Sequence, residues 1–342
     1  MRGILVALGI TLGIAQNAMA FEVEATRIFG PADPVRSLSV LSTTDIAILQ
    51  PVITAYLDQN PDLGLRYVMA SSQEVYRAIA DEGAAFDLVI SSAMDLQIKL
   101  ANDGFALPLP ADLMDDQPAW ARWRNLLVSV AQEPVVLILS DAALRPGEDV
   151  PRSRRDLIAL LRDNPDRFRG KVGTYDPAIS GSGYLFAAQD ARLSDTFWRL
   201  AEVMGRLDAR LFCCSVDMID EVRAGRLLVA YNVLGSYAVA EGDKGILVVE
   251  LEDFTLTLLR TSLVPRHSAS PARAVDFLRY LLSPEGQALI AKGAGLPAVE
   301  AAAFDRNPHL RPIRLDPGLL AHLDAVTRQR FLIEWRAAMD QP

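Results

Sequence analysis

Short apolar runs alternate with helix-like patterns over the first hundred residues. Residues 38–41, 65–69 and 86–90 are mostly apolar and bounded by polar residues, as buried strands are. The stretch after the first run places four apolar side chains on one helix face: Ile46, Leu49, Ile53 and Leu57. This alternation of strand and helix predicts an α/β fold with a mainly parallel sheet covered by helices.

Each of the three predicted strands runs into a small cluster of hydroxyl residues. The clusters are Ser42, Thr43 and Thr44, then Ser71 and Ser72, then Ser91 and Ser92. Ligands of parallel sheets bind beyond the carboxyl ends of the strands, where helix N-termini offer free N–H groups. Serine and threonine are also preferred N-caps, so a single cluster has a purely structural explanation. Three clusters at one sheet edge favour an anion-binding site.

A similar unit follows in the middle of the chain. An apolar, β-rich stretch at 126–139 is interrupted by polar residues and a proline at 132–134, and a helix is expected at 156–162. A strand at 170–175 precedes Ser180, Gly181, Ser182 and Gly183, and a helix is expected at 185–192. The glycines would let the backbone approach a ligand closely, although a surface turn is the alternative. The spacing matches neither a P-loop nor a dinucleotide-binding motif.

A further strand at 227–232 ends in polar residues that could meet the same ligand. Asn232, Ser236 and Tyr237 offer hydrogen bonds at its carboxyl end. Tyr231 lies within the strand pattern and is expected to be a packed aromatic residue.

Two strand-like stretches, near 128–140 and 255–265, would carry the chain between two lobes. We expect lobe 1 to comprise residues 21–130 and 262–342, and lobe 2 to comprise residues 131–261. Helices at 271–282 and 317–339 would pack on lobe 1. Two crossings imply a hinge, with a cleft between the lobes.

The first twenty residues are typical of an export signal. A basic start at Arg2 leads into an apolar run, and Ala18, Met19 and Ala20 form a small-x-small cleavage site before Phe21. We expect cleavage after Ala20 and export of the mature protein to the periplasm.

Composition narrows the choice of partners. The 342 residues carry a formal net charge of −9, with 51% hydrophobic and 23% charged residues. The acidic balance argues against nucleic acid and anionic membranes, which bind basic surfaces. With three histidines and two cysteines, a zinc framework is not expected. We expect neither a cofactor nor a resident metal.

The two cysteines, Cys213 and Cys214, are adjacent and precede Ser215. Within one chain they form either a vicinal disulfide or two free thiols, and export favours oxidation. They could serve as a rigid turn or small buried side chains, or they could form a wall of the cleft.

Signs of catalysis are weak. No Gly-x-Ser-x-Gly motif occurs, and His267, His309 and His322 all lie far from the serine clusters in sequence. We therefore expect no enzymatic activity, with an exported phosphoester hydrolase as the alternative.

Several segments resemble the solute-binding proteins of ABC importers, in the cluster that binds ferric iron, phosphonates, sugar phosphates or thiamine. The segments are 38–44, 86–92, 171–178, 180–184 and 277–287, where the last resembles the family's late Phe-Leu-Ser-Pro-Glu-Gly-Gln helix. The resemblance covers about residues 36 to 297. It implies a type II-like two-lobed periplasmic binding protein, each lobe with its own sheet, that closes on a solute and delivers it to an inner-membrane permease.

The departures from that pattern bear on the solute. Iron-binding members carry a histidine in the first loop and two adjacent tyrosines late in the chain. Here the loop reads Ser42, Thr43, Thr44 without histidine, and the later position reads Ser236-Tyr237. Ferric iron needs several anionic oxygens, so we expect a small organic anion bearing phosphate, phosphonate or carboxylate. Ferric iron or an iron chelate, and ligand presentation to a membrane sensor kinase, remain alternatives. We expect a monomer.

Overall fold

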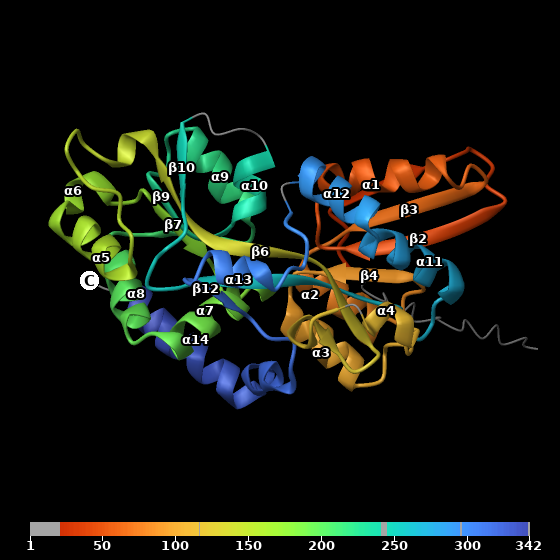
Figure 1. Cartoon of the computed structure of the whole chain (residues 1–342). Helices are drawn as coiled ribbons and strands as arrows, with labels where there is room; N and C mark the ends of the chain where they lie inside the picture. Colours follow the sequence, from red (N-terminus) through yellow and green to blue (C-terminus); the bar gives the residue numbers. More distant parts are fainter. Residues whose placement is uncertain (1–20, 116, 241–244, 295, 341–342) are drawn as a thin grey trace, which may run out of the picture.

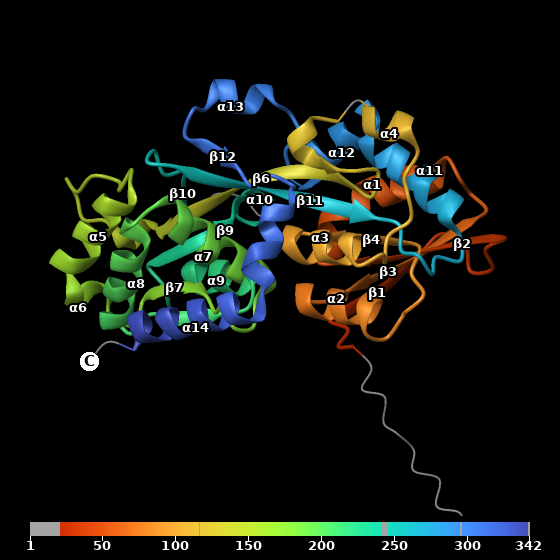
Figure 2. The same ribbon diagram turned by 90° about the horizontal axis from the view of Figure 1, so that it is seen from below.

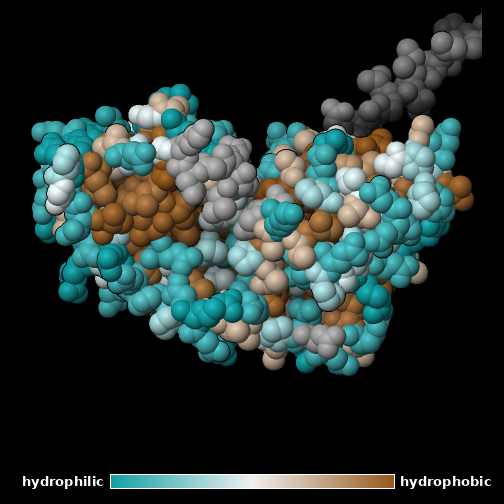
Figure 3. Space-filling model, turned by 45° about the horizontal axis from the view of Figure 1, so that its top comes forward, coloured by the Kyte–Doolittle hydropathy of each residue, from teal (hydrophilic) through white to brown (hydrophobic). Residues whose placement is uncertain are grey.

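The computed structural model describes residues 21–115, 117–240, 245–294 and 296–340. The predicted export signal, residues 1–20, lies outside these ranges. Within them, no helix is both long enough and apolar enough to cross a membrane. The visible surface is mostly hydrophilic, with an apolar area on the left half (Figure 3).

The chain forms two lobes, which lie to the right and left in Figure 1. Lobe 1, on the right, is built from the early strands and from helices taken from both ends of the sequence. Its strands are β1 Ala25–Phe29, β2 Arg36–Ser42, β3 Leu63–Met69 and β4 Leu88–Ser91. Its helices are α1 Ile46–Asp58, α2 Ser72–Ala80, α3 Met94–Asn102, α4 Ala111–Asp115, α11 Pro271–Leu282 and α12 Pro284–Ala294.

Lobe 2 is formed by the middle of the chain together with the C-terminal helix. Its strands are β7 Val172–Tyr175, β8 Arg210–Phe212, β9 Val229–Leu234 and β10 Ile246–Val249. Its helices are α5 Arg154–Asp163, α6 Pro165–Phe168, α7 Gly181–Leu193, α8 Thr196–Arg206, α9 Ser215–Arg223, α10 Gly235–Ala240 and α14 Ala325–Met339. Short connecting elements complete the fold: η1 Ala119–Ala121, β5 Arg122–Trp123, η2 Asp141–Ala143, α13 Ala302–Arg306, β12 Leu310–Pro312 and η3 Pro317–Leu323.

Two long strands, β6 Leu127–Ser140 and β11 Thr255–Leu263, join the lobes. They pair antiparallel with each other at the centre of the strand order β1-β3-β2-β4-β11-β6-β9-β7-β8. On either side the sheet is largely parallel, in β3-β2-β4 and in β9-β7-β8. The predicted α/β class, parallel sheet and two crossing strands are confirmed.

The polar residues at 132–134 do not break β6, contrary to the sequence-based expectation. The strand continues through them because Glu133 is buried against Arg260 of β11, with 2.8 Å between Oε1 and Nε. A buried ion pair thus accompanies a continuous strand at the position where the sequence pattern predicts an interruption.

The C-terminal segment also differs from expectation. Asp324 accepts a hydrogen bond from the N–H of Thr327 at 2.9 Å and starts a new helix, so residues 317–339 form η3 and α14 rather than one helix. Trp335 of α14 stacks on Phe197 of α8, with ring centroids 5.9 Å apart. Figure 2 shows α14 lying against α8. The assignment of all of 262–342 to lobe 1 is therefore wrong for α14, whose aromatic side chains pack on lobe 2.

Candidate functional site

A cleft of about 360 Å³ lies between the two lobes. Lobe 1 lines it with Glu24, Thr43, Asp45, Met69, Ala70, Ser71, Ser72 and Ser92. Lobe 2 lines it with Tyr175, Ile179, Ser180, Ser182, Cys213, Cys214, Ser215, Val216, Asp217, Leu234 and Tyr237. The cleft therefore lies at the carboxyl ends of the strands of both lobes, where an α/β sheet usually binds its ligand.

Most of the hydroxyl residues singled out in the sequence lie in this lining. They are Thr43, Ser71, Ser72, Ser92, Ser180, Ser182, Ser215 and Tyr237, and the Cys213–Cys214 pair lies beside them. They meet because β2, β3 and β4 of lobe 1 run in the direction opposite to β7 of lobe 2, so the carboxyl ends of both sets of strands face the cleft. The cleft wall thus offers many neutral hydrogen-bonding groups to a small molecule.

A chain of hydroxyls crosses the cleft from lobe 1 to lobe 2. Oγ1 of Thr43 lies 3.3 Å from Oγ of Ser92, and Oγ of Ser92 lies 3.0 Å from Oγ of Ser182. Thr43 Oγ1 also accepts a hydrogen bond from the Ser92 N–H at 3.1 Å. The two lobes are therefore in direct polar contact within the cleft.

The lobes also meet closely at Ser72 and Gly181. A Cβ atom at Gly181 would lie 2.5 Å from Oγ of Ser72, so a larger residue would push the lobes apart. Gly183 packs equally closely on Tyr175, where an added Cβ would lie 2.5 Å from the tyrosine Cβ. These glycines belong to the first turn of α7, with Ser180 as N-cap, rather than to the predicted loop before a helix at 185.

Four helices begin at the cleft. Asp45, Ser71, Ser180 and Cys214 are the N-cap residues of α1, α2, α7 and α9. All four line the cleft. Helix N-termini carry partial positive charge and free N–H groups, which favour an anionic or strongly polar acceptor.

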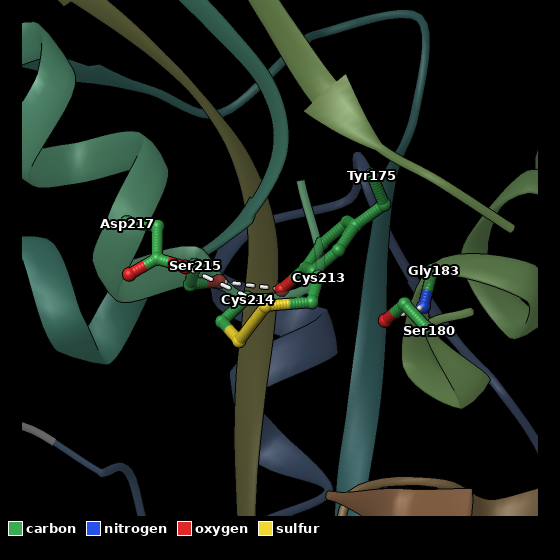
Figure 4. Close-up of a disulfide and its surroundings, with 7 residues drawn as sticks. All are labelled: Tyr175, Ser180, Gly183, Cys213, Cys214, Ser215 and Asp217. Atoms are coloured by element: carbon green, nitrogen blue, oxygen red, sulfur yellow. Dashed lines mark hydrogen bonds between the residues drawn. A yellow bond between two sulfur atoms is a disulfide. The ribbon is translucent and has the colours of Figure 1, made fainter. Parts of the chain in front are cut away.

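Cys213 and Cys214 form a vicinal disulfide in the wall of lobe 2. The phenol of Tyr175 points towards the neighbouring Ser215, and their oxygens are 2.6 Å apart (Figure 4). Ser215 Oγ also accepts a hydrogen bond from the Leu234 N–H at 3.0 Å, so both Tyr175 and Ser215 are held in place. Of the two states left open by the sequence, the structure has the disulfide.

Three predicted residues, Ser42, Thr44 and Ser91, lie outside the lining and support its loops. Ser42 Oγ accepts the N–H of Thr44 at 3.0 Å, and Ser91 Oγ accepts the N–H of Ala93 at 3.1 Å. All three are buried. They shape the turns that carry Thr43 and Ser92 into the cleft.

Asn232 and Ser236 also lie outside the lining. Asn232 donates to Oδ2 of Asp190 at 3.0 Å, within a buried group that includes Tyr231 and Arg154. Burial of Tyr231 confirms its interpretation as a packed aromatic residue. Ser236 donates to the carboxylate of Glu133.

A buried polar network connects the cleft to the hinge strands. Arg260 of β11 pairs with Glu133 of β6, donates to Thr44 Oγ1 at 2.5 Å and lies 3.5 Å from the hydroxyl of Tyr237. The network therefore joins the first loop of lobe 1, both crossing strands and the cleft-lining Tyr237 of lobe 2. The sequence indicated none of these contacts because Arg260 lies 23 positions from Tyr237, 127 from Glu133 and 216 from Thr44.

Carboxylates in the lining were also missed. Asp45 directly follows the first hydroxyl cluster, and this position in the sequence could have indicated that its carboxylate lines the cleft. Asp217 lies in the first turn of α9, and Glu24 precedes β1. Glu24 reaches the cleft because β1 pairs antiparallel with β3, and its N–H donates to the carbonyl of Met69 at 2.9 Å. No sequence pattern singled out β1.

Comparisons with known proteins indicate the kind of molecule that has this architecture. The family model described as bacterial extracellular solute-binding protein matches residues 38–293. No curated protein matches the chain.

Solved structures share the fold over almost their whole length. The substrate-binding protein of an ABC transporter from Agrobacterium tumefaciens is 30% identical, covers 92% of this chain and 98% of its own, and has a TM-score of 0.87. AfuA from Actinobacillus pleuropneumoniae, solved with fructose-6-phosphate, is 16% identical and has a TM-score of 0.71. The match covers 90% of this chain and 100% of the AfuA chain. Iron-bound HitA from Pseudomonas aeruginosa is 17% identical and has a TM-score of 0.67. The match covers 88% of this chain and 99% of the HitA chain.

Proposed function

Because the chain belongs to the bacterial extracellular solute-binding proteins, we propose that it captures a small solute in the cleft between its lobes. We further propose that it delivers this solute to an ABC permease in the inner membrane. The observation that carries the proposal is the arrangement of hydroxyls from both lobes around one cleft, with Ser92 and Ser182 in contact across it.

Solute capture would proceed by closure of the lobes about β6 and β11. In the part of the chain that the structure describes, two strands and the C-terminal segment connect the lobes, and a rotation about these connections opens or closes the cleft. A solute that bonds to Ser72 and Thr43 on one side and to Ser180 and Ser182 on the other favours the closed form. It does so because it makes both sets of bonds only when the lobes are together.

The solute is proposed to carry an anionic group such as phosphate, phosphonate or carboxylate. Such a group accepts hydrogen bonds from hydroxyls and from N–H groups at the starts of α2 and α7. These donors are held by the fold, so binding costs little reorganisation.

An organic solute suits the cleft better than bare ferric iron. Iron prefers anionic oxygen ligands, including phenolate. Burial raises the pKa of both cleft tyrosines, Tyr175 and Tyr237, and so opposes phenolate formation. The phenol of Tyr175 is also occupied by its hydrogen bond to Ser215.

Native mass spectrometry of the protein purified from an exporting host tests the proposal. We expect one small organic molecule bound to each chain. The mass of the protein itself should show the loss of residues 1–20 that the sequence predicts. Incubation with p-nitrophenyl phosphate should release no p-nitrophenol above a blank. Steady turnover that disappears in Ser182→Ala would instead support an exported phosphoester hydrolase.

A further inference from the structure

Three carboxylates line the solute cleft, and they come from both lobes. Glu24 and Asp45 belong to lobe 1, whereas Asp217 belongs to α9 of lobe 2. None of them forms a salt bridge with any residue that the structure describes. The cleft therefore presents negative charges that the protein itself does not neutralise.

The rest of the lining does not balance these charges. Among the described residues, the lining contains hydroxyl, apolar and sulfur side chains but no lysine or arginine. Desolvation raises the pKa of Glu24, and the negative charges of Asp45, Glu22 and Asp217 raise it further. The acidic groups thus act on one another across the cleft.

With the lobes together, the charges of Asp45 and Asp217 act on Glu24, and like charges close to one another raise the free energy of this arrangement. A positive group between them turns this repulsion into attraction. The cleft is assigned as the solute site by its hydroxyls and by family membership, independently of the carboxylates. The acidic residues therefore bear on what the solute carries.

A single metal ion does not fit this arrangement. Within the described chain, the ligand atoms of His, Cys, Asp and Glu converge to within 4.8 Å in one group, Cys213, Cys214 and Asp217. Both sulfurs of that group are in the disulfide. Glu24 and Asp45 do not converge with Asp217 in this way.

We infer that the solute carries a cationic group, such as an ammonium, on the acidic side of the cleft that Glu24, Asp45 and Asp217 line, in addition to the anionic group held by the hydroxyls. The inference rests on the proposed function and narrows the solute class to zwitterions. The ammonium would lie near the side of the cleft formed by the start of β1 and by α9. The anionic group would lie at the starts of α2 and α7.

Matched pairs of compounds test this inference. Phosphoethanolamine is compared with ethyl phosphate, and 4-aminobutanoate with butanoate, by thermal shift and isothermal titration calorimetry. In each pair the anionic group is the same and only the ammonium differs. The ammonium-bearing member of a pair should bind at least about tenfold more tightly, which corresponds to about 1.4 kcal/mol.

Variants then locate the effect. Glu24→Gln together with Asp45→Asn should remove most of the preference for the ammonium-bearing member. Asp220→Asn is the matched control, because Asp220 is also on α9 but lies outside the cleft lining. That variant should keep the preference unchanged.

The outcomes separate the two proposals. Equal or tighter binding of the ammonium-free members would overturn the inference and leave the proposed function intact. If no compound of the panel binds, the composition of the co-purified adduct decides, and an adduct without a basic nitrogen overturns the inference. A protein that binds no compound and carries no adduct contradicts both.

Discussion

The serine hydroxyls of the cleft owe their arrangement to the direction of the strands before them. Ser92 follows β4, Ser72 follows β3 and Ser182 lies beyond β7, so two segments of lobe 1 and one of lobe 2 each place a hydroxyl in the cleft. Their neighbours Ser42 and Ser91 turn away and hold the backbone. In the first and third clusters, Thr43 and Ser92 thus line the cleft while Ser42 and Ser91 support the turns.

The Asp95 carboxyl lies outside the solute cleft and predicts how the stability of the protein depends on pH. Asp95 is buried at the start of α3, and desolvation raises its pKa to about 7. In the unfolded chain the pKa of an aspartate is about 3.9. Between about pH 4 and 7 the folded protein therefore retains a proton that the unfolded chain has lost.

The free energy of unfolding should consequently fall as pH rises from about 4 to about 7, and the Asp95 contribution should be fully lost above about pH 7. Urea unfolding of the wild type and of Asp95→Asn across this window measures the effect. The variant should show a shallower decline with rising pH. Identical pH profiles for the two proteins would refute the raised pKa of Asp95 in the folded protein.

At the scale of elements, β6 and β11 carry the buried ion pair of the hinge. Glu133 and Arg260 are almost completely buried, and their partners Thr44, Ser236 and Tyr237 lie on both lobes. Removing one charge leaves the other buried without its partner, which is more costly than removing both.

Arg260→Met should lower the free energy of unfolding by about 3–5 kcal/mol. The double variant Arg260→Met, Glu133→Leu should lose less, since it leaves no unpaired charge. Chemical denaturation of the wild type, both single variants and the double variant measures the difference. A double variant that loses the sum of the two single losses would show that the residues do not act as a pair.

The C-terminal helix α14 provides a second prediction at this scale. Trp335 is 3% exposed and stacks on Phe197 of α8, so Trp335→Ala should cost about 3–5 kcal/mol of unfolding free energy. Ile333 of the same helix is 57% exposed, and Ile333→Ala should change the value by less than about 0.5 kcal/mol. Equal effects of the two substitutions would contradict the packing of α14 on lobe 2.

The elements could largely be predicted from the sequence, because apolar periodicity is local. The strands that became β2, β3, β4 and β7, and the crossings β6 and β11, were all recognised from such runs. The place of α14 could not be predicted, because the choice between two lobes depends on which surface accepts Trp335 and Phe331. Periodicity shows that a helix has an apolar face but not what covers it.

The site was predicted in part for the same reason. Hydroxyl clusters at strand ends are visible in the sequence, and most of them line the cleft. Glu24 and Asp217 were not foreseen, since their position depends on the pairing of β1 with β3 and on how the lobes approach each other. The roles of Asn232 and Ser236 depend on buried partners that are distant in sequence.

At the scale of the whole molecule, the two lobes face each other across a cleft, and polar contacts join the two lobes within it. The hydroxyl chain from Thr43 through Ser92 to Ser182 and the close approach of Gly181 to Ser72 bring the lobes together. The C-terminal segment touches both lobes as well, through η3 against α3 and α14 against α8. A solute held by hydroxyls of both lobes would add its own bonds to these contacts and so favour the closed arrangement.

The most direct test of the account is the affinity of the cleft for the co-purified solute after loss of one hydroxyl from each lobe. Isothermal titration should show that Ser72→Ala with Ser182→Ala weakens binding at least about tenfold, because each lost hydrogen bond contributes about 0.5–1.5 kcal/mol. Ser37→Ala, at an exposed position of β2, should bind as the wild type does. Unchanged affinity in the double variant would contradict the assignment of the cleft as the solute site.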